Sequence, residues 1–283
     1  MSDSNSVINF GDLAKPATVL IEKVSNAVGV LYEPRRIRKK AEAEAEKIKA
    51  LAGIELNEIQ QRGIERFVQQ EARKQANVES ITAQAASQLD ASAKTENLEE
   101  DWIAHFFDKC DKVSDEDMQS LWSNLLAREA TTPGTYSKRT VDFVASMDKQ
   151  DAELFTKFCQ FVWMIGDPTP LIFDFGNDVY TKQGITFEVL KHLDTIGLIS
   201  FESVSGYRRT HLPKRTVFFY FGRPTLFEFK NDNDNEFQLG KVLLTQAGRE
   251  LVSVCGANRS QEFYDYSISE LHKQGITLAS LFA

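Results

Sequence analysis

The sequence predicts a mainly α-helical protein that ends in a smaller α+β module. Apolar residues recur at three- and four-residue steps near the start, and aromatic residues follow at helical spacings in the middle. Alternating β-branched and aromatic residues, with Pro and Gly, become frequent only after Gly166. We therefore expect long N-terminal helices over 1–95, a helical core domain over 96–166 and a winged-helix-like domain over 167–283.

Composition indicates a folded chain and limits its partners. The 283 residues are 42% hydrophobic and 26% charged, which is typical of globular proteins. The formal net charge of −8 repels phosphate, so contact with nucleic acid or an anionic membrane would need a local basic patch. Three scattered cysteines, and the lack of a signal peptide or a long apolar run, predict a cytoplasmic protein.

The N-terminal third predicts helices that need a partner. An amphipathic helix is expected from Leu13 to Leu31, with its end near Pro34, because proline disfavours a helix in the residue before it. The stretch from Ala41 to Ser92 is rich in strong helix formers but sparse in apolar residues. One or two long, partly exposed helices are expected there, packed against a second copy or the next domain.

Capping residues mark the helices of the predicted core domain. Ser114 to Asp117 precedes an apolar helix centred on Trp122, and Asp148 with Asp151 precedes another. Both acidic groups are therefore explained as helix starts.

The C-terminal third predicts a helix, a strand, a hairpin and a second helix. A short strand is expected over 171–173, a helix over 186–196 and a strand over 198–201. A β-hairpin is expected from 215–221 and 225–229, and Thr245 is the expected N-cap of the next helix. The tail over 259–283 is expected to be extended first and then helical, ending in Leu278 and Leu281.

No motif for cofactor, metal or catalytic chemistry stands out. The chain contains neither phosphate-binding glycine motif, and its four histidines are far apart. Asn231 to Glu236 lacks the glycine of a calcium loop, and Glu228 to Lys230 lacks an upstream aspartate for a nuclease site. We assign no cofactor, no metal and no catalytic residue, and an enzyme is the less favoured class.

Two basic groups are the candidate contact sites. The first follows the N-terminal amphipathic helix and could bind a membrane surface or nucleic acid, or pair with Glu42, Glu44 and Glu46. The second lies in the expected hairpin region, where it is either a phosphate contact or a solvated turn. The candidate residues are Arg35, Arg36, Arg38, Lys39 and Lys40, then Arg208, Arg209, Lys214 and Arg215.

Three stretches carry a resemblance to a known group of proteins. They are DLAKPATVLIEKVSNAVG at 12–29, DMQSLWSNLLAREATTPGTYSKRTVDFVASMDKQDAELF at 117–155 and GKVLLTQAGREL at 240–251. Together they resemble a bacterial family of unknown function that is similar in layout to the abortive-infection alpha proteins. The resemblance implies a role in defence against phage, with no catalytic residue to carry over. The longer Ala41–Ser92 segment suggests an added arm for oligomerisation or partner binding.

These observations support three hypotheses. The first is a non-enzymatic bacterial defence or regulatory protein that forms homo-oligomers and contacts a protein partner through its N-terminal helices. The second is a winged-helix regulator that binds DNA, and the third is an effector that acts at a membrane surface through the N-terminal amphipathic helix.

Overall fold

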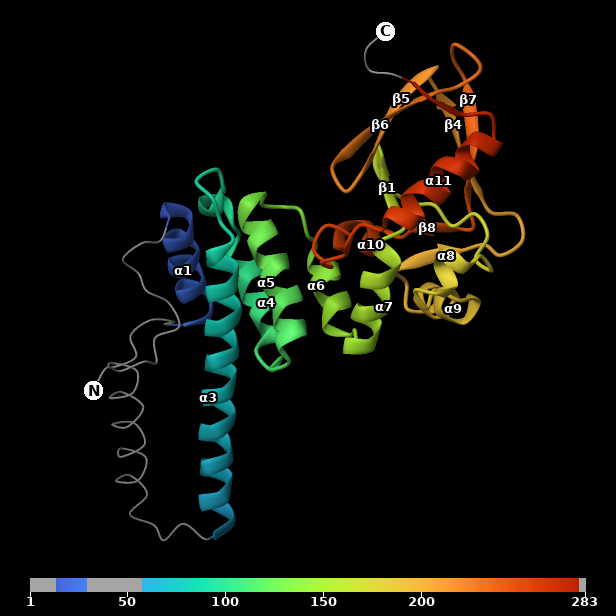
Figure 1. Cartoon of the computed structure of the whole chain (residues 1–283). Helices are drawn as coiled ribbons and strands as arrows, with labels where there is room; N and C mark the ends of the chain where they lie inside the picture. Colours follow the sequence, from blue (N-terminus) through green and yellow to red (C-terminus); the bar gives the residue numbers. More distant parts are fainter. Residues whose placement is uncertain (1–13, 30–57, 280–283) are drawn as a thin grey trace. The chain divides into compact units, whose positions relative to one another are not determined.

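The computed structural model describes residues 14–29 and 58–279 (Figure 1). The chain divides into two compact units, Met1–Ser146 and Met147–Ala283. This division differs from the boundaries expected near residues 95 and 167, because the N-terminal helices share a core with the central ones. Among the described helices, none is both long and apolar enough to cross a bilayer.

The first unit is helical, and α1 packs against α3 and α4 within it. Pro16 lies in the first turn of α1, where its missing N–H costs nothing. The helix ends before Gly29, whose φ of 100° leaves the helical region, rather than near Pro34. The elements are α1 (Lys15–Val28), α3 (Glu58–Ser87), η2 (Thr95–Asn97), α4 (Glu100–Cys110), α5 (Glu116–Thr131) and α6 (Lys138–Ala145).

Aromatic rings form the core of this unit. The Phe106 ring lies 5.1 Å from the rings of both Trp102 and Trp122, and all three side chains are buried. The predicted cap of α5 is confirmed, because the Asp115 carboxylate accepts hydrogen bonds from the backbone N–H groups of Asp117 and Met118. Tertiary packing therefore holds together helices that are short on their own.

The second unit combines helices with antiparallel strands. Its helices are α7 (Lys149–Cys159), α8 (Asp178–Thr181), α9 (Phe187–Thr195), α10 (Gln246–Leu251) and α11 (Gln261–Lys273). Its strands are β1 (Val162–Ile165), β2 (Asp167–Pro170), β3 (Ile199–Phe201), β4 (Tyr207–Leu212), β5 (Arg215–Tyr220), β6 (Arg223–Glu228), β7 (Asn235–Gly240), β8 (Val242–Leu244) and β9 (Thr277–Leu278).

The strands form one larger sheet and two separate ladders. The sheet has the order β2-β1-β5-β6-β9, while β3 pairs with β8 and β4 pairs with β7, all antiparallel. The predicted hairpin is confirmed as β5–β6, and Phe221 and Gly222 form its two-residue turn with positive φ angles of 46° and 75°. The predicted caps of α7 and α10 at Asp148 and Thr245 are also confirmed, and the Thr186 side chain caps α9.

Two expectations for this unit are wrong. Residues 171–173 form no strand; Ile172 makes a single bridge to Gly240, because β2 has already folded back on β1 at Gly166. The tail has the opposite order, since α11 comes first, capped by Ser260, and β9 follows. Gly275, with φ of 80°, lies between them, and Leu278 extends the sheet instead of ending a helix.

Candidate functional site

Among the described residues of the first unit, the most exposed large apolar side chains lie in the first part of α3. Every residue from Glu58 to Arg73 is exposed, and we call this segment the exposed half of α3. Ile59 is 73% exposed, Phe67 63% and Val68 54%. Scattered apolar side chains are ordinary on a protein surface, but a concentration of them on one helix marks a contact surface.

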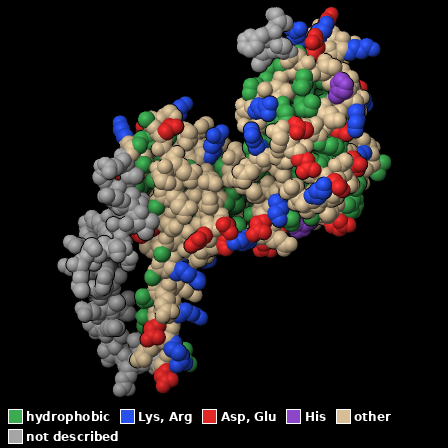
Figure 2. Space-filling view, in the orientation of Figure 1, with side chains coloured by type: hydrophobic (Ala, Val, Ile, Leu, Met, Phe, Trp, Pro, Cys, Tyr) green, Lys and Arg blue, Asp and Glu red, His purple; other side chains and the backbone are tan. Residues whose placement is uncertain are grey.

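The exposed half of α3 is amphipathic. With 100° between successive residues, Ile64, Phe67 and Val68 lie within an arc of about 100° on one side of the helix, whereas Ile59 lies about 180° from Val68. Arg62 lies on the opposite side, and it forms an exposed ion pair with Glu58 at 3.4 Å. Figure 2 shows basic, acidic and hydrophobic side chains together along this end of the helix. The apolar side of the helix therefore suits an apolar partner surface, and the charged side suits water or a charged partner.

A buried polar cluster fixes the other half of α3. Asn77 Nδ2 donates to the backbone oxygen of Asp111 at 2.8 Å, and Gln119 Nε2 donates to Asn77 Oδ1 at 3.1 Å. Gln119 Nε2 also donates to the backbone oxygen of Val113 at 2.8 Å. Both side chains are buried, so their hydrogen bonds replace those that water would make. Asn77 is the first buried residue of α3, so the buried part of the helix begins at this cluster.

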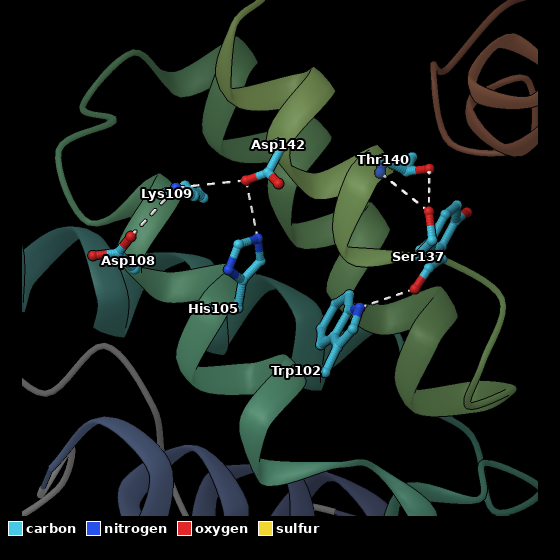
Figure 3. A network of polar contacts seen from close by, with 8 residues as sticks. Trp102, His105, Asp108, Lys109, Ser137, Thr140 and Asp142 are labelled. Carbon is cyan, nitrogen blue, oxygen red and sulfur yellow. Dashed lines mark hydrogen bonds and ion pairs between the residues drawn. The ribbon is translucent and has the colours of Figure 1, made fainter.

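A second polar network joins α4 to α6 (Figure 3). His105 Nε2 lies 3.0 Å from Asp142 Oδ1, and Lys109 Nζ lies 3.5 Å from the same oxygen. Lys109 also lies 3.5 Å from Asp108. The imidazole and the carboxylate lack the alignment of a good hydrogen bond, and the carboxylate is shared between the imidazole and the Lys109 ammonium. We interpret the network as a connection between helices, since His105 and Lys109 lie on α4 and Asp142 lies on α6.

A buried carboxylate shapes the loop between α5 and α6. Glu129 Oε1 accepts the backbone N–H of Gly134 at 2.6 Å, and Oε2 accepts that of Tyr136 at 2.8 Å. Trp102 Nε1 donates to the backbone oxygen of Tyr136 at 2.9 Å (Figure 3). Burial raises the pKa of Glu129, and the backbone hydrogen bonds oppose that rise. The loop is thus held from two helices.

The predicted basic group of the C-terminal module lies on β4, β5 and the segment between them. Lys214 Nζ lies 2.9 Å from Asp232, Arg208 lies 3.4 Å from Glu236 and Arg215 lies 3.6 Å from Glu228. Arg209 is half-buried in the β4–β7 ladder. Each exposed cation of the group is therefore beside a carboxylate, which reduces the positive potential available to a phosphate backbone.

The other predicted contact residues lie elsewhere. The basic cluster Arg35, Arg36, Arg38, Lys39 and Lys40 lies outside the described residues. In the helix before it, Leu20 and Val24 are fully buried within the first unit, so the apolar side of α1 is already covered. Within the described ranges, no group of three or more His, Cys, Asp or Glu residues is placed to hold a metal ion.

Fold and surfaces define a protein with a helical unit, a mixed α+β unit and an exposed amphipathic helix. The chain belongs to the family described as protein of unknown function DUF2806, whose model matches residues 61–267. No curated protein and no solved structure matches the chain. The similarity to abortive-infection alpha proteins stays a prediction.

The sequence alone did not indicate several of the residues that form buried polar contacts in the first unit. The cluster at Asn77 and Gln119 joins side chains 42 positions apart, and no local pattern signals such a pairing. For Glu129, the only available signal is an acidic residue just ahead of the Pro133–Gly134 loop.

Proposed function

We propose that this protein is a non-enzymatic assembly protein, and that the apolar side of the exposed half of α3 binds the same surface of a second copy. The observation that carries the proposal is the exposure of Ile64, Phe67 and Val68 on one side of a helix that is anchored at its other end. Removing these side chains from water favours association, at about 1.5–3 kcal/mol for each fully buried one.

Charge supports a second copy as the partner. Between Glu58 and Lys74 the helix carries four basic residues (Arg62, Arg66, Arg73 and Lys74) and three acidic ones (Glu58, Glu65 and Glu71), a net charge of +1. Two copies of this segment therefore meet with little repulsion, although the whole chain has a net charge of −8. Both signs are available for ion pairs at the rim of such a contact.

The biological setting that we propose is defence against phage, or related regulation, in the bacterial cytoplasm. This part of the proposal rests on the sequence resemblance alone. Assembly through a helix fits such a role, because a change in concentration or an added partner shifts an oligomer equilibrium without any catalytic step.

The test is the mass of the full-length protein in solution, measured by light scattering over a range of concentrations. We expect a defined oligomer, and we expect Phe67→Glu to weaken association at least tenfold, because burial of one such ring is worth more than about 1.4 kcal/mol. Gln69→Glu adds the same charge on the other side of α3 and should leave the mass unchanged. A wild-type monomer at all concentrations, or equal effects of the two variants, would refute the proposal.

DNA binding is the second candidate, and one observation favours it. The β3–β8 ladder follows α9 directly and leads into α10, which is the order of a winged-helix module. Under this proposal Lys214 and Arg215 contact phosphate after leaving Asp232 and Glu228. Fluorescence anisotropy with duplex DNA at low salt tests it. Lys214→Glu with Arg215→Glu should abolish binding, and unchanged binding would exclude this surface.

A further inference from the structure

The five-stranded sheet of the second unit carries apolar side chains on both of its faces. One face is covered by α11, where the ring of Trp163 lies 5.3 Å from the ring of Tyr264. On the opposite face lie Met164 of β1 and, at alternate positions of β5, Val217 and Phe219. An antiparallel sheet that meets water on one face usually carries polar side chains there. The second face of this sheet is therefore suited to an apolar ligand.

The strand register places a row of apolar residues across this face. Met164 lies opposite Pro168 of β2 and Phe219 of β5, and Phe219 lies opposite Pro224 of β6. Directly opposite residues of antiparallel strands share one face, so the four side chains form a continuous row, which we call the apolar row. Met164 is 40% exposed, Phe219 is 43% exposed and Pro224 is exposed. From Met164 to Pro224 the row extends for about 10 Å.

A pocket of about 290 Å³ opens beside Met164, which belongs to both the pocket and the apolar row. Its lining includes Cys159 and Val162, whose side chains are buried, so the pocket reaches the core of the second unit. Phe221, at the turn between β5 and β6, lines it as well and is 42% exposed. None of the eight described residues that line the pocket is charged. The part of a ligand that enters this pocket is therefore uncharged.

The pocket and the apolar row together suit a long, narrow molecule. At about 30 Å³ for each atom of the size of a water molecule or a methylene group, the pocket holds about ten atoms. A longer chain continues from the pocket onto the apolar row, because Met164 borders both. The flexible thioether of Met164 adapts its shape to such a chain. An unbranched alkyl chain has the required width, apolar character and ability to bend.

Area and charge favour a single small ligand over a folded partner or a membrane. Met164, Phe219 and Phe221 together leave about 250 Å² of apolar area exposed, whereas a stable protein interface buries about 800 Å² on each partner. At the described outward positions of the five strands, the charged residues are Arg215 and Glu228, an ion pair at 3.6 Å. This face therefore offers no excess of basic residues to an anionic bilayer.

We propose that the pocket and the apolar row form a binding site for a long-chain fatty acid. The methyl end of the chain lies in the pocket, the middle of the chain lies along Met164 and Phe219, and the carboxylate stays in water. Each methylene group that leaves water adds about fourfold to the affinity. Affinity therefore rises with chain length beyond the chain that fills the pocket.

The test uses the full-length protein and isothermal titration with octanoate, decanoate and palmitate. We expect palmitate to bind at least tenfold more tightly than octanoate. Protein labelled at its four methionine methyl groups reports the place of binding by nuclear magnetic resonance. The Met164 signal, assigned with Met164→Leu, should shift, and the signal of the buried Met118 in the first unit should not. No binding, equal affinities, or an unchanged Met164 signal would overturn the proposal.

Two variants separate the pocket from the apolar row. Ala257→Trp fills the pocket and should weaken all three fatty acids at least tenfold. Phe219→Ser shortens the apolar row and should weaken palmitate about fivefold while leaving octanoate unchanged, because octanoate fits within the pocket. Phe187→Ser is the matched control, since Phe187 is equally exposed elsewhere in the same unit. If Ala257→Trp does not fold, Phe219→Ser still decides the question. Equal effects of Phe219→Ser and Phe187→Ser would refute the site.

Two further measurements test the other occupants of this face. A lower mass of Phe219→Ser than of the wild type in light scattering would show that a second copy covers the face, and would overturn the proposal. Sedimentation with phosphatidylcholine vesicles that is lost in Phe219→Ser would assign the face to a membrane and overturn it as well. We expect neither result. Phe67→Glu, which tests assembly through α3, should leave palmitate binding unchanged, so the two proposals fail separately.

Discussion

Gln119 Nε2 donates a hydrogen bond to Asn77 Oδ1 at 3.1 Å inside the first unit, so that α3 and α5 share a buried polar contact. Ser80 Oγ adds a hydrogen bond to Gln119 Oε1 at 2.8 Å. A helix that is exposed over half its length is held at this cluster, and the cluster determines how firmly the exposed half is presented.

Asn77→Ala should lower the free energy of unfolding by about 1–3 kcal/mol, because it leaves the amide of Gln119 with one partner fewer in a buried site. Urea titration measures the change. Gln88→Ala is the control, since Gln88 is exposed just after α3. Equal midpoints for the two variants would mean that the cluster contributes nothing to stability.

Glu129 should give the first unit an unusual pH dependence. Burial raises the pKa of its carboxyl in the folded state above the ordinary 4.5, so the folded protein binds this proton more tightly than the unfolded chain does. The resulting stabilisation is complete below pH 4.5 and is lost as pH rises through the raised pKa. Compared with Glu129→Gln, the wild type should therefore gain stability as pH falls through this window.

The measurement for Glu129 is the difference in unfolding free energy between wild type and variant at several pH values. Glu96→Gln is the matched control, because Glu96 is exposed in the same unit. A difference that stays constant with pH for Glu129→Gln would contradict the assignment.

Gly240→Ala should destabilise the second unit by more than about 2 kcal/mol. Gly240 has φ of 105°, and a Cβ atom there would lie 2.0 Å from the backbone oxygen of Ile172. Gly222→Ala separates the two causes, since Gly222 also has positive φ but no atom within 4 Å of its Cβ position. In thermal unfolding, the melting temperature of Gly240→Ala should be well below that of Gly222→Ala. Similar melting temperatures would exclude a steric clash at the Ile172 backbone as the cause.

Tyr220→Phe should cost about 1–3 kcal/mol of stability, because it leaves the backbone oxygen of Gln160 and the N–H of Ser260 without their shared partner. Burial raises the pKa of Tyr220 to about 12 from an ordinary value of 10.0. The wild type should therefore lose stability between pH 10 and about 12, and the variant should lack this loss.

Denaturant titration at neutral and alkaline pH tests both parts of this prediction. Tyr207→Phe serves as the control, because its hydroxyl contacts Ser200 at 2.9 Å in an exposed place. If Tyr220→Phe and Tyr207→Phe lower the free energy of unfolding equally, the hydrogen bonds of the Tyr220 hydroxyl do not stabilise the second unit.

Local signals in the sequence predicted local structure well. Asp115, Thr186 and Thr245 cap helices as their residue types suggest, and the alternation before and after Gly222 does form a hairpin. Each of these features depends on residues within a few positions of one another, where chemistry and spacing are both visible.

Long-range contacts were not predictable in the same way. The β3–β8 ladder joins Ile199 to Leu244, and a hydrogen bond joins Thr156 Oγ1 to the backbone oxygen of Cys255. Both contacts depend on the path of the chain between the two partners. The spacing of apolar residues in the sequence gives no information about that path. The tail was misjudged because Leu278 is apolar at helical spacing, while Gly275 had already ended the helix.

The outer strands of the five-stranded sheet limit what can be added to it. Two of the four residues of β2 are prolines, Pro168 and Pro170, and neither has an N–H to offer to another strand. At the opposite edge, β9 contributes only Thr277 and Leu278. The edges of the sheet therefore offer few free backbone groups to a strand of another chain. We expect the sheet to resist edge-to-edge aggregation, although Met164 and Phe219 are exposed on it.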